Sequence, residues 1–93
     1  MQYLRERFIT VEDDWYPCYK GNKVKLRLNL IAYGKYYVKI AAWGADDTAY
    51  EQEFEYDNYE EARDKYDSLI PLFETIPNGI TKEWFIDRGF VRF

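Results

Sequence analysis

The sequence predicts an α+β fold: an antiparallel β-meander of three to five strands, with one main α-helix packed on one face and a short C-terminal helix. Three observations predict it. Apolar and polar residues alternate with period two in several runs before residue 57. Short turn segments join these runs, as antiparallel pairing permits. From residue 59 to residue 73, apolar residues recur every three or four positions. Residues 1–93 are expected to form one domain.

The N-terminal segment, residues 3–11, leaves two interpretations open. Leu4 and Phe8 would share one face of a helix, whereas residues 7–11 have a pattern that favours a strand. Residues 23–30 give the clearest strand, because aliphatic side chains alternate there with Lys, Arg and Asn. The aliphatic side chains are therefore expected on one face and the cations on the other.

Two turns extend this strand into a meander. A turn at residues 33–35 leads to a second apolar row at residues 36–42, and so short a connection predicts an antiparallel hairpin. A second turn at residues 44–47 leads to a third strand of about residues 48–56. Three glutamates alternate there with Tyr, Gln and Phe, so all three are expected on one face.

The main helix is expected to begin after Asn58, which can form a capping box with Glu61. Pro71 removes a backbone donor and clashes with the preceding turn, so we expect a break or kink there and a short further turn through Ile76. The expected buried face consists of Tyr59, Ala62, Tyr66, Leu69 and Phe73.

The C-terminal segment predicts one further helix and one further strand. Thr81 is expected to cap a helix over residues 82–88, and Gly89 to end it in the left-handed conformation. Residues 90–93 are expected to form an edge strand.

The residue types argue against catalysis. The chain contains no histidine, which removes the commonest general base and the commonest transition-metal ligand. The sequence holds no phosphate-binding loop, nucleophile elbow or dinucleotide fingerprint. Asp46 and Asp47 fall in a predicted turn, where aspartate is common for backbone reasons. We therefore expect no enzymatic activity, no cofactor and no metal site.

The sequence favours a cytoplasmic location. Cys18 is the only cysteine, which excludes an intramolecular disulfide and is typical of a reducing compartment. The N-terminal residues lack the apolar stretch of a signal peptide. No uncharged run approaches the roughly 20 residues that a bilayer requires, so no contact with a membrane is expected.

Charge is distributed unevenly along the chain. Residues 1–35 hold seven Lys or Arg against four Asp or Glu, residues 36–79 hold three against eleven, and residues 80–93 hold three against two. The net charges are thus +3, −8 and +1, which sum to the −4 of the whole chain. A surface that binds nucleic acid directly requires the opposite balance, so we expect no direct nucleic-acid partner.

The acidic strand leaves two functional interpretations open. Side chains two residues apart on a strand lie about 6.5–7 Å from each other, and phosphates of one duplex strand lie about 3.4 Å apart along the axis. The three glutamates of residues 51–55 could therefore imitate a nucleic-acid backbone and occupy a basic groove of a partner. Alternatively, Lys25, Arg27 and Lys39 neutralise them across the sheet.

Aromatic residues cluster in the predicted loop at residues 15–19. Exposed aromatic side chains are typical of the residues that dominate protein–protein binding energy. They would serve as apolar anchors for a partner, or else fold over one edge of the core.

Part of the sequence resembles a known family. Its residues over 36–90 occur in an order shared with that family: Tyr36, Tyr37, Trp43, Gly44, Phe54, Glu61, Ala62, Tyr66, Thr81, Trp84 and Arg88. This order is similar to that of WGR domains, which assist nucleic-acid binding in some DNA-repair proteins. Ala45 stands where that family has arginine, so the resemblance implies a shared topology and no functional residues.

A second resemblance concerns the chain as a whole. Its short length, its acidic balance and the runs 46–51 and 81–85 resemble small proteins of phages and mobile elements of Gram-positive bacteria, some of which are anti-CRISPR or other anti-defence factors. That resemblance implies the cytoplasm of a host cell and a basic, nucleic-acid-binding host protein as the partner.

The sequence thus predicts a non-enzymatic inhibitor or adaptor that binds a protein, with an acidic surface that acts as a nucleic-acid mimic. The alternative is a small structural module that assembles through a sheet edge or an aromatic surface, with a homodimer as its simplest form. The residues expected to contact the partner are Trp15, Tyr16, Tyr19, Asp46, Asp47, Glu51, Glu53, Glu55, Glu60 and Asp64.

Overall fold

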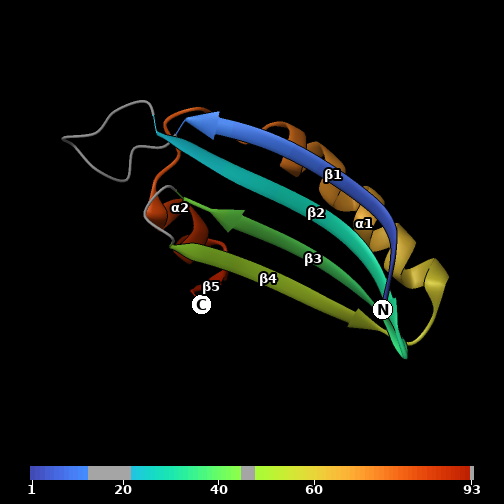
Figure 1. Cartoon of the computed structure of the whole chain (residues 1–93). Helices are drawn as coiled ribbons and strands as arrows, with labels where there is room; N and C mark the ends of the chain where they lie inside the picture. The colour runs from blue at the N-terminus through green and yellow to red at the C-terminus, as the bar shows by residue number, and fades with distance from the viewer. Residues whose placement is uncertain (13–21, 45–47, 93) are drawn as a thin grey trace.

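A computed structural model of the chain describes residues 1–12, 22–44 and 48–92. A five-stranded antiparallel sheet has the strands in sequence order, and two helices follow the fourth strand (Figure 1). This arrangement confirms the predicted α+β meander. The elements are β1 (Gln2–Glu12), β2 (Lys23–Tyr33), β3 (Lys35–Trp43), β4 (Ala49–Tyr56), α1 (Tyr59–Glu74), α2 (Lys82–Asp87) and β5 (Val91–Arg92).

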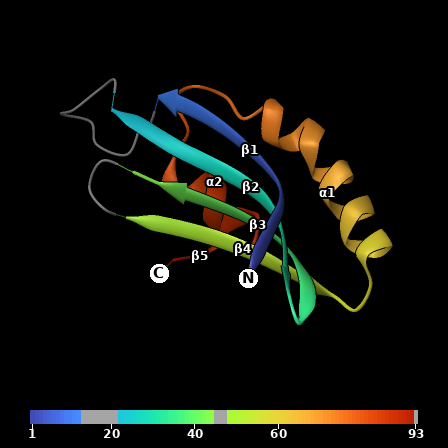
Figure 2. The same cartoon turned by 45° about the vertical axis from the view of Figure 1, so that its right-hand side comes forward.

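The hydrophobic core lies between the sheet and the helices, on one face of the sheet (Figure 2). Strand β2 contributes Val24, Leu26, Leu28 and Leu30, each at most 1% exposed. Because strand side chains alternate between faces, these four aliphatic residues all point toward the helices. The predicted division of β2 into an aliphatic face and a cationic face is therefore confirmed.

Gly34 makes the tight β2–β3 turn. It lies between the paired residues Tyr33 and Lys35 and has a φ of 73°. An L side chain rarely adopts this left-handed conformation, which costs glycine little. The turn fixes the register so that Leu28 faces Ile40, and both lie on the core side.

Strand β1 is longer than its clearest sequence pattern and includes the segment for which a helix was the alternative. A register shift between Tyr3 and Arg5 inserts one extra residue opposite β2. Such a bulge changes which side chains share a face. Tyr3 consequently lies on the side away from the helices, while Arg5 and Arg7 lie on the helix side.

Helix α1 begins as expected. The Asn58 Oδ1 accepts a hydrogen bond from the Glu61 backbone N–H at 2.9 Å. Its buried residues are Ala62, Tyr66, Leu69 and Phe73, and Tyr59 packs against them while only partly buried.

The expected helix break at Pro71 is wrong, because α1 continues without interruption to Glu74. Pro71 lies on the exposed side of the helix, where water can satisfy the carbonyl that loses its donor. Burial of Leu69 and Phe73 on either side holds the helix on the sheet. Thr75 then closes the last turn, as its hydroxyl donates to the Pro71 carbonyl at 2.8 Å.

Helix α2 covers the other end of the same face. The Thr81 Oγ1 accepts a hydrogen bond from the Trp84 N–H at 3.3 Å, and Gly89 has a φ of 82°, as predicted. Phe85 is fully buried and stacks on Tyr50 of β4 with ring centroids 5.3 Å apart. In the described part of the chain, no helix has the length and apolar character needed to cross a bilayer.

Candidate functional site: the open face of the sheet

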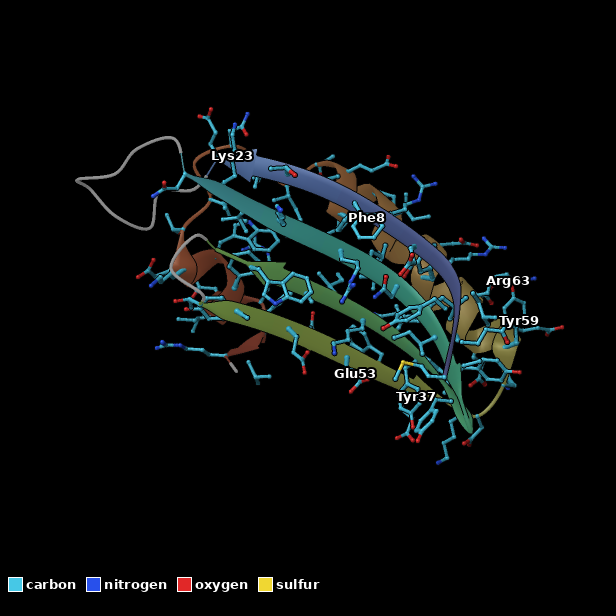
Figure 3. The ribbon with its side chains drawn as sticks, in the orientation of Figure 1. Phe8, Lys23, Tyr37, Glu53, Tyr59 and Arg63 are labelled. Carbon is cyan, nitrogen blue, oxygen red and sulfur yellow. The ribbon has the colours of Figure 1, made fainter. Side chains whose placement is uncertain are left out.

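No helix of the described residues covers the second face of the sheet, which we call the open face. The strand registers place one row of side chains across four strands: Phe8 of β1, Arg27 of β2, Ala41 of β3 and Glu51 of β4. Figure 3 shows Phe8, Tyr37 and Glu53 on their three strands. The other large or charged side chains of the open face include Tyr3, Glu6, Lys25, Asn29, Ile31, Tyr33, Lys39, Trp43 and Glu55.

Large apolar side chains are exposed mainly on this face. Phe8 is 65% exposed, Tyr33 64% and Tyr3 47%. By comparison, the helices expose Leu72 (38%) and Ile86 (57%), one on α1 and one on α2. Exposed apolar groups that gather on one surface are typical of a binding site.

Arg27 and Trp43 form a fixed pair on the open face. The Arg27 guanidinium carbon lies 5.0 Å from the centre of the Trp43 ring, a cation–π distance. Asn29 is only 2% exposed. With its amide oriented to satisfy both polar atoms, its oxygen accepts from the Arg27 Nε at 3.1 Å and its nitrogen donates to the Leu28 carbonyl at 3.3 Å. The guanidinium is therefore held both by an aromatic ring and by a buried amide.

Lys39 and Glu51 form the least exposed ion pair of the described residues. Their Nζ and Oε2 atoms lie 2.8 Å apart, and the side chains are 28% and 22% exposed. The Glu51 Oε2 is fully shielded from water but lacks a well-aligned hydrogen bond. At this short distance, the Lys39 ammonium offsets much of the free-energy cost of burying the Glu51 carboxylate. For Glu51, the structure therefore shows the alternative in which a lysine of the same sheet neutralises the glutamate.

Glu55 is also paired. The Lys35 Nζ lies 3.5 Å from it and equally far from Asp57. These carboxylates, Glu55 first, raise the pKa of Lys35. The Tyr37 hydroxyl donates to Glu55 at 3.4 Å, and desolvation, followed by the Glu55 charge, raises the pKa of Tyr37.

Glu53 differs from its two neighbours. It faces Lys39 directly across the β3–β4 ladder, but the Lys39 ammonium reaches diagonally to Glu51 instead. Within the residues that the structure describes, Glu53 forms no ion pair. It is therefore the one glutamate of the β4 row that forms no ion pair there.

The structure does not bring the predicted acidic residues onto one surface. Glu60 and Asp64 lie on α1, on the side of the sheet opposite the β4 row, and the Asp64 carboxylate lies 3.4 Å from Arg63. The predicted contact residues Trp15, Tyr16, Tyr19, Asp46 and Asp47 lie outside the described residues.

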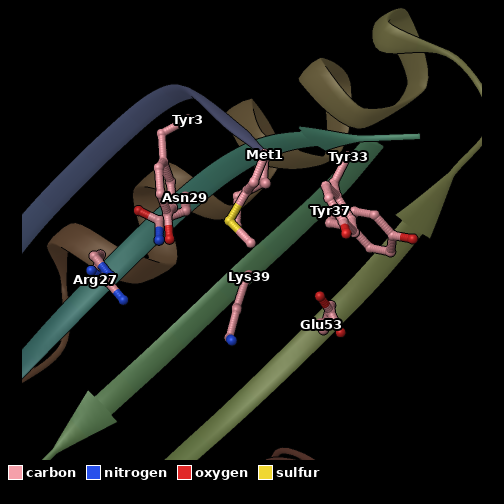
Figure 4. Close-up of a pocket in the computed structure, with 9 residues that line it drawn as sticks. Met1, Tyr3, Arg27, Asn29, Tyr33, Tyr37, Lys39 and Glu53 are labelled. Atoms are coloured by element: carbon pink, nitrogen blue, oxygen red, sulfur yellow. The ribbon is translucent and has the colours of Figure 1, made fainter. Parts of the chain in front are cut away.

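A cavity of about 330 Å³ opens on this face between the start of β1 and the β2–β4 strands (Figure 4). Most of the residues around it were not predicted as site residues from the sequence. The alternation in β2 predicted that Arg27 and Asn29 lie on the face opposite the aliphatic residues. The sequence did not show that this face would stay uncovered by the helices. The cavity is lined by Met1, Tyr3, Arg27, Asn29, Ile31, Tyr33, Tyr37, Lys39 and Glu53.

Among residues 1–12, 22–44 and 48–92, no three His, Cys, Asp or Glu side chains gather in a way that could hold a metal ion. Comparisons of the chain with protein-family models, with curated proteins and with solved structures found no match. The open face is consequently the candidate site on geometric and chemical grounds alone.

Proposed function

We propose that this chain is a non-enzymatic binding protein that recognises a protein partner through the open face of its sheet. The observation that carries the proposal is the set of exposed aromatic side chains, Tyr3, Phe8 and Tyr33, on the one sheet face that the helices leave uncovered. Tyr, Trp and Arg residues dominate the energy of protein interfaces, and all three types occur on this face.

The charges of the open face suggest how a partner would be oriented. Lys25 and Arg27 lie on β2, while Glu53, which forms no ion pair within the described residues, lies on β4. A partner with carboxylates opposite β2 and cations opposite β4 would match both strips. Such complementarity mainly sets orientation and association rate.

In its narrower form, the proposal is that the β4 glutamates occupy a basic, nucleic-acid-binding groove of the partner, which would make the chain an inhibitor. Glu51 and Glu55 already have lysine partners within the chain, so they offer little attraction to a second cation. Glu53 is the carboxylate best placed to contribute. The aromatic contacts would then supply most of the binding energy.

The test removes one exposed apolar side chain from each side of the molecule, Phe8 from the open face and Ile86 from α2. Phe8→Thr keeps a residue suited to a strand, and Ile86→Ala keeps one suited to a helix. Immobilised protein should capture its partner from lysate of the organism that encodes it. We expect Phe8→Thr to weaken capture about 30-fold, as at an interface hot spot, and Ile86→Ala to leave it unchanged. Equal capture by both variants would reject the open face as the contact surface.

The free edge of β1 favours a second candidate function, assembly with a further copy of the chain. β1 is an outer strand of the sheet, and no other described strand pairs with its second edge. Exposed strand edges are templates for pairing. If two copies pair antiparallel about Phe8, Glu6 faces Thr10 and Arg7 faces Ile9, whereas pairing about Arg7 opposes two like charges.

Sedimentation velocity tests this second candidate. Assembly predicts a mass that rises with concentration from 11.3 kDa toward twice that value. It also predicts that Phe8→Lys, which would oppose two ammonium groups at the centre of the pair, keeps the protein monomeric. A single-chain mass for the unmodified protein at millimolar concentration would exclude the assembly.

A further inference from the structure

The cavity of the open face has the size of a small ligand site. Its volume of about 330 Å³ lies at the lower end of the range, about 300–1,000 Å³, that ligand pockets occupy. It is large enough for one long side chain of a partner. Figure 4 shows Tyr33 and Tyr37 at one end of it, with Glu53 and Lys39 nearby.

Glu53 supplies the charge that decides which side chain fits. It lines the cavity and has no ion pair within the described residues, because the Lys39 ammonium lies 2.8 Å from Glu51 instead. The charge of Glu53 also acts on Tyr37, whose pKa it helps to raise after burial and Glu55. An incoming cation would therefore meet a carboxylate that is not already neutralised.

The tyrosines supply the second requirement of a cation site. Tyr3, Tyr33 and Tyr37 all line the cavity, together with Met1 and Ile31. Aromatic faces attract ammonium and guanidinium groups, and the apolar walls can cover the methylene stem that carries such a group.

The Lys39 and Arg27 side chains of the cavity are already engaged in contacts within the chain. Lys39 is neutralised by Glu51. Arg27 lies over the Trp43 ring at 5.0 Å, and its Nε donates to the Asn29 amide oxygen. Lys39 is thus compensated by Glu51, and Arg27 is oriented toward two neutral partners, which leaves Glu53 as the carboxylate of the cavity that forms no ion pair within the described residues.

We propose that this cavity binds a lysine or arginine side chain of the protein partner, with Glu53 as its counter-charge and Tyr33 and Tyr37 as its aromatic walls. The inference rests on the proposed function of the open face, and it specifies which partner residue enters that face. It also gives the acidic β4 row a defined role, in which the Glu53 carboxylate binds one lysine or arginine of the partner.

The test uses four capped tripeptides, acetyl-Gly-X-Gly-amide with X as Lys, Arg, Gln or Glu, added to the ¹⁵N-labelled protein at low salt. We expect the Lys and Arg peptides to give saturable shifts of the Tyr37, Lys39 and Glu53 amide signals. Because hydrogen bonds to charged groups are strong, the Gln peptide should bind about tenfold more weakly.

Matched variants separate a local effect from the overall charge. Glu53→Gln should weaken binding of the Lys and Arg peptides about tenfold, while Glu60→Gln, the same change on the exposed side of α1, should leave it unaltered. Equal binding of the Lys and Gln peptides, saturation by the Glu peptide at Arg27, or equal effects of both variants would overturn the proposal.

A failure of the cavity proposal can be distinguished from a failure of the proposed function. Phe8 does not line the cavity. If the cationic peptides fail to bind while Phe8→Thr still weakens capture as expected, the cavity proposal fails and the open-face proposal stands. If the peptides bind as expected while Phe8→Thr captures normally, the cation site is upheld and the wider contact surface is rejected.

Discussion

Phe73→Ala should lower the free energy of unfolding by about 3–5 kcal/mol, the usual cost of removing a fully buried phenylalanine. Phe73 has no exposed surface and belongs to the core cluster between α1 and the sheet. Domains of this size have total stabilities of roughly 5–15 kcal/mol. The variant should therefore be partly unfolded in mild denaturant, with a clear shift of the urea midpoint.

Leu72 provides the matched control. It is the neighbouring residue on α1 and is 38% exposed. Alanine is an excellent helix former, so Leu72→Ala should cost less than about 1 kcal/mol. Equal losses for the two variants would contradict the way in which α1 is packed on the sheet.

Lys39→Met should give the second large effect, a loss of about 1–3 kcal/mol of stability. It removes the counter-charge of Glu51, whose Oε2 is shielded from water. An unpaired charge that is fully buried costs about 3–5 kcal/mol, and the partial exposure of this pair reduces that figure. Chemical denaturation at pH 7 measures the loss.

Lys35→Met is the control for this prediction. Lys35 and its partner Glu55 are each more than half exposed, and solvent screening leaves such exposed pairs with little effect on stability. The double variant Lys39→Met with Glu51→Leu should recover most of the lost stability, because apolar residues often replace a buried ion pair without cost. Equal losses of stability for the two lysine variants would show that the Lys39–Glu51 pair stabilises the fold no more than the exposed Lys35–Glu55 pair.

Local patterns predicted most of the fold. The alternation of residues 23–30 and the helical spacing of residues 59–73 reflect side-chain directions that depend only on the local backbone. The helix caps Asn58 and Thr81 were predictable for the same reason, since their hydrogen bonds close within three residues.

Features that depend on distant contacts were not predictable from the sequence. Pro71 remains inside α1 because the burial of Leu69 and Phe73 outweighs the lost hydrogen bond. The register shift near Tyr3 sets which side chains of β1 face away from the helices. Alternation shows that a strand has two faces, but only the return path of α1 and α2 determines which one is covered.

The same limit applies to the candidate site. The sequence indicated three glutamates on one strand face, and the structure places them there. Direct pairing across the ladder would match Lys39 with Glu53, yet its side chain takes the diagonal to Glu51. Because the Lys39 side chain reaches Glu51, Glu53 lines the cavity without an ion pair from the described residues.

Hydrogen–deuterium exchange of the chain, alone and bound to its captured partner, tests the central claim most directly. Recognition through the open face predicts slower exchange along β1–β4, strongest around Phe8, Arg27 and Tyr37, and unchanged exchange over the outer surface of α1. Protection confined to α1, with the four strands unaffected, would contradict it.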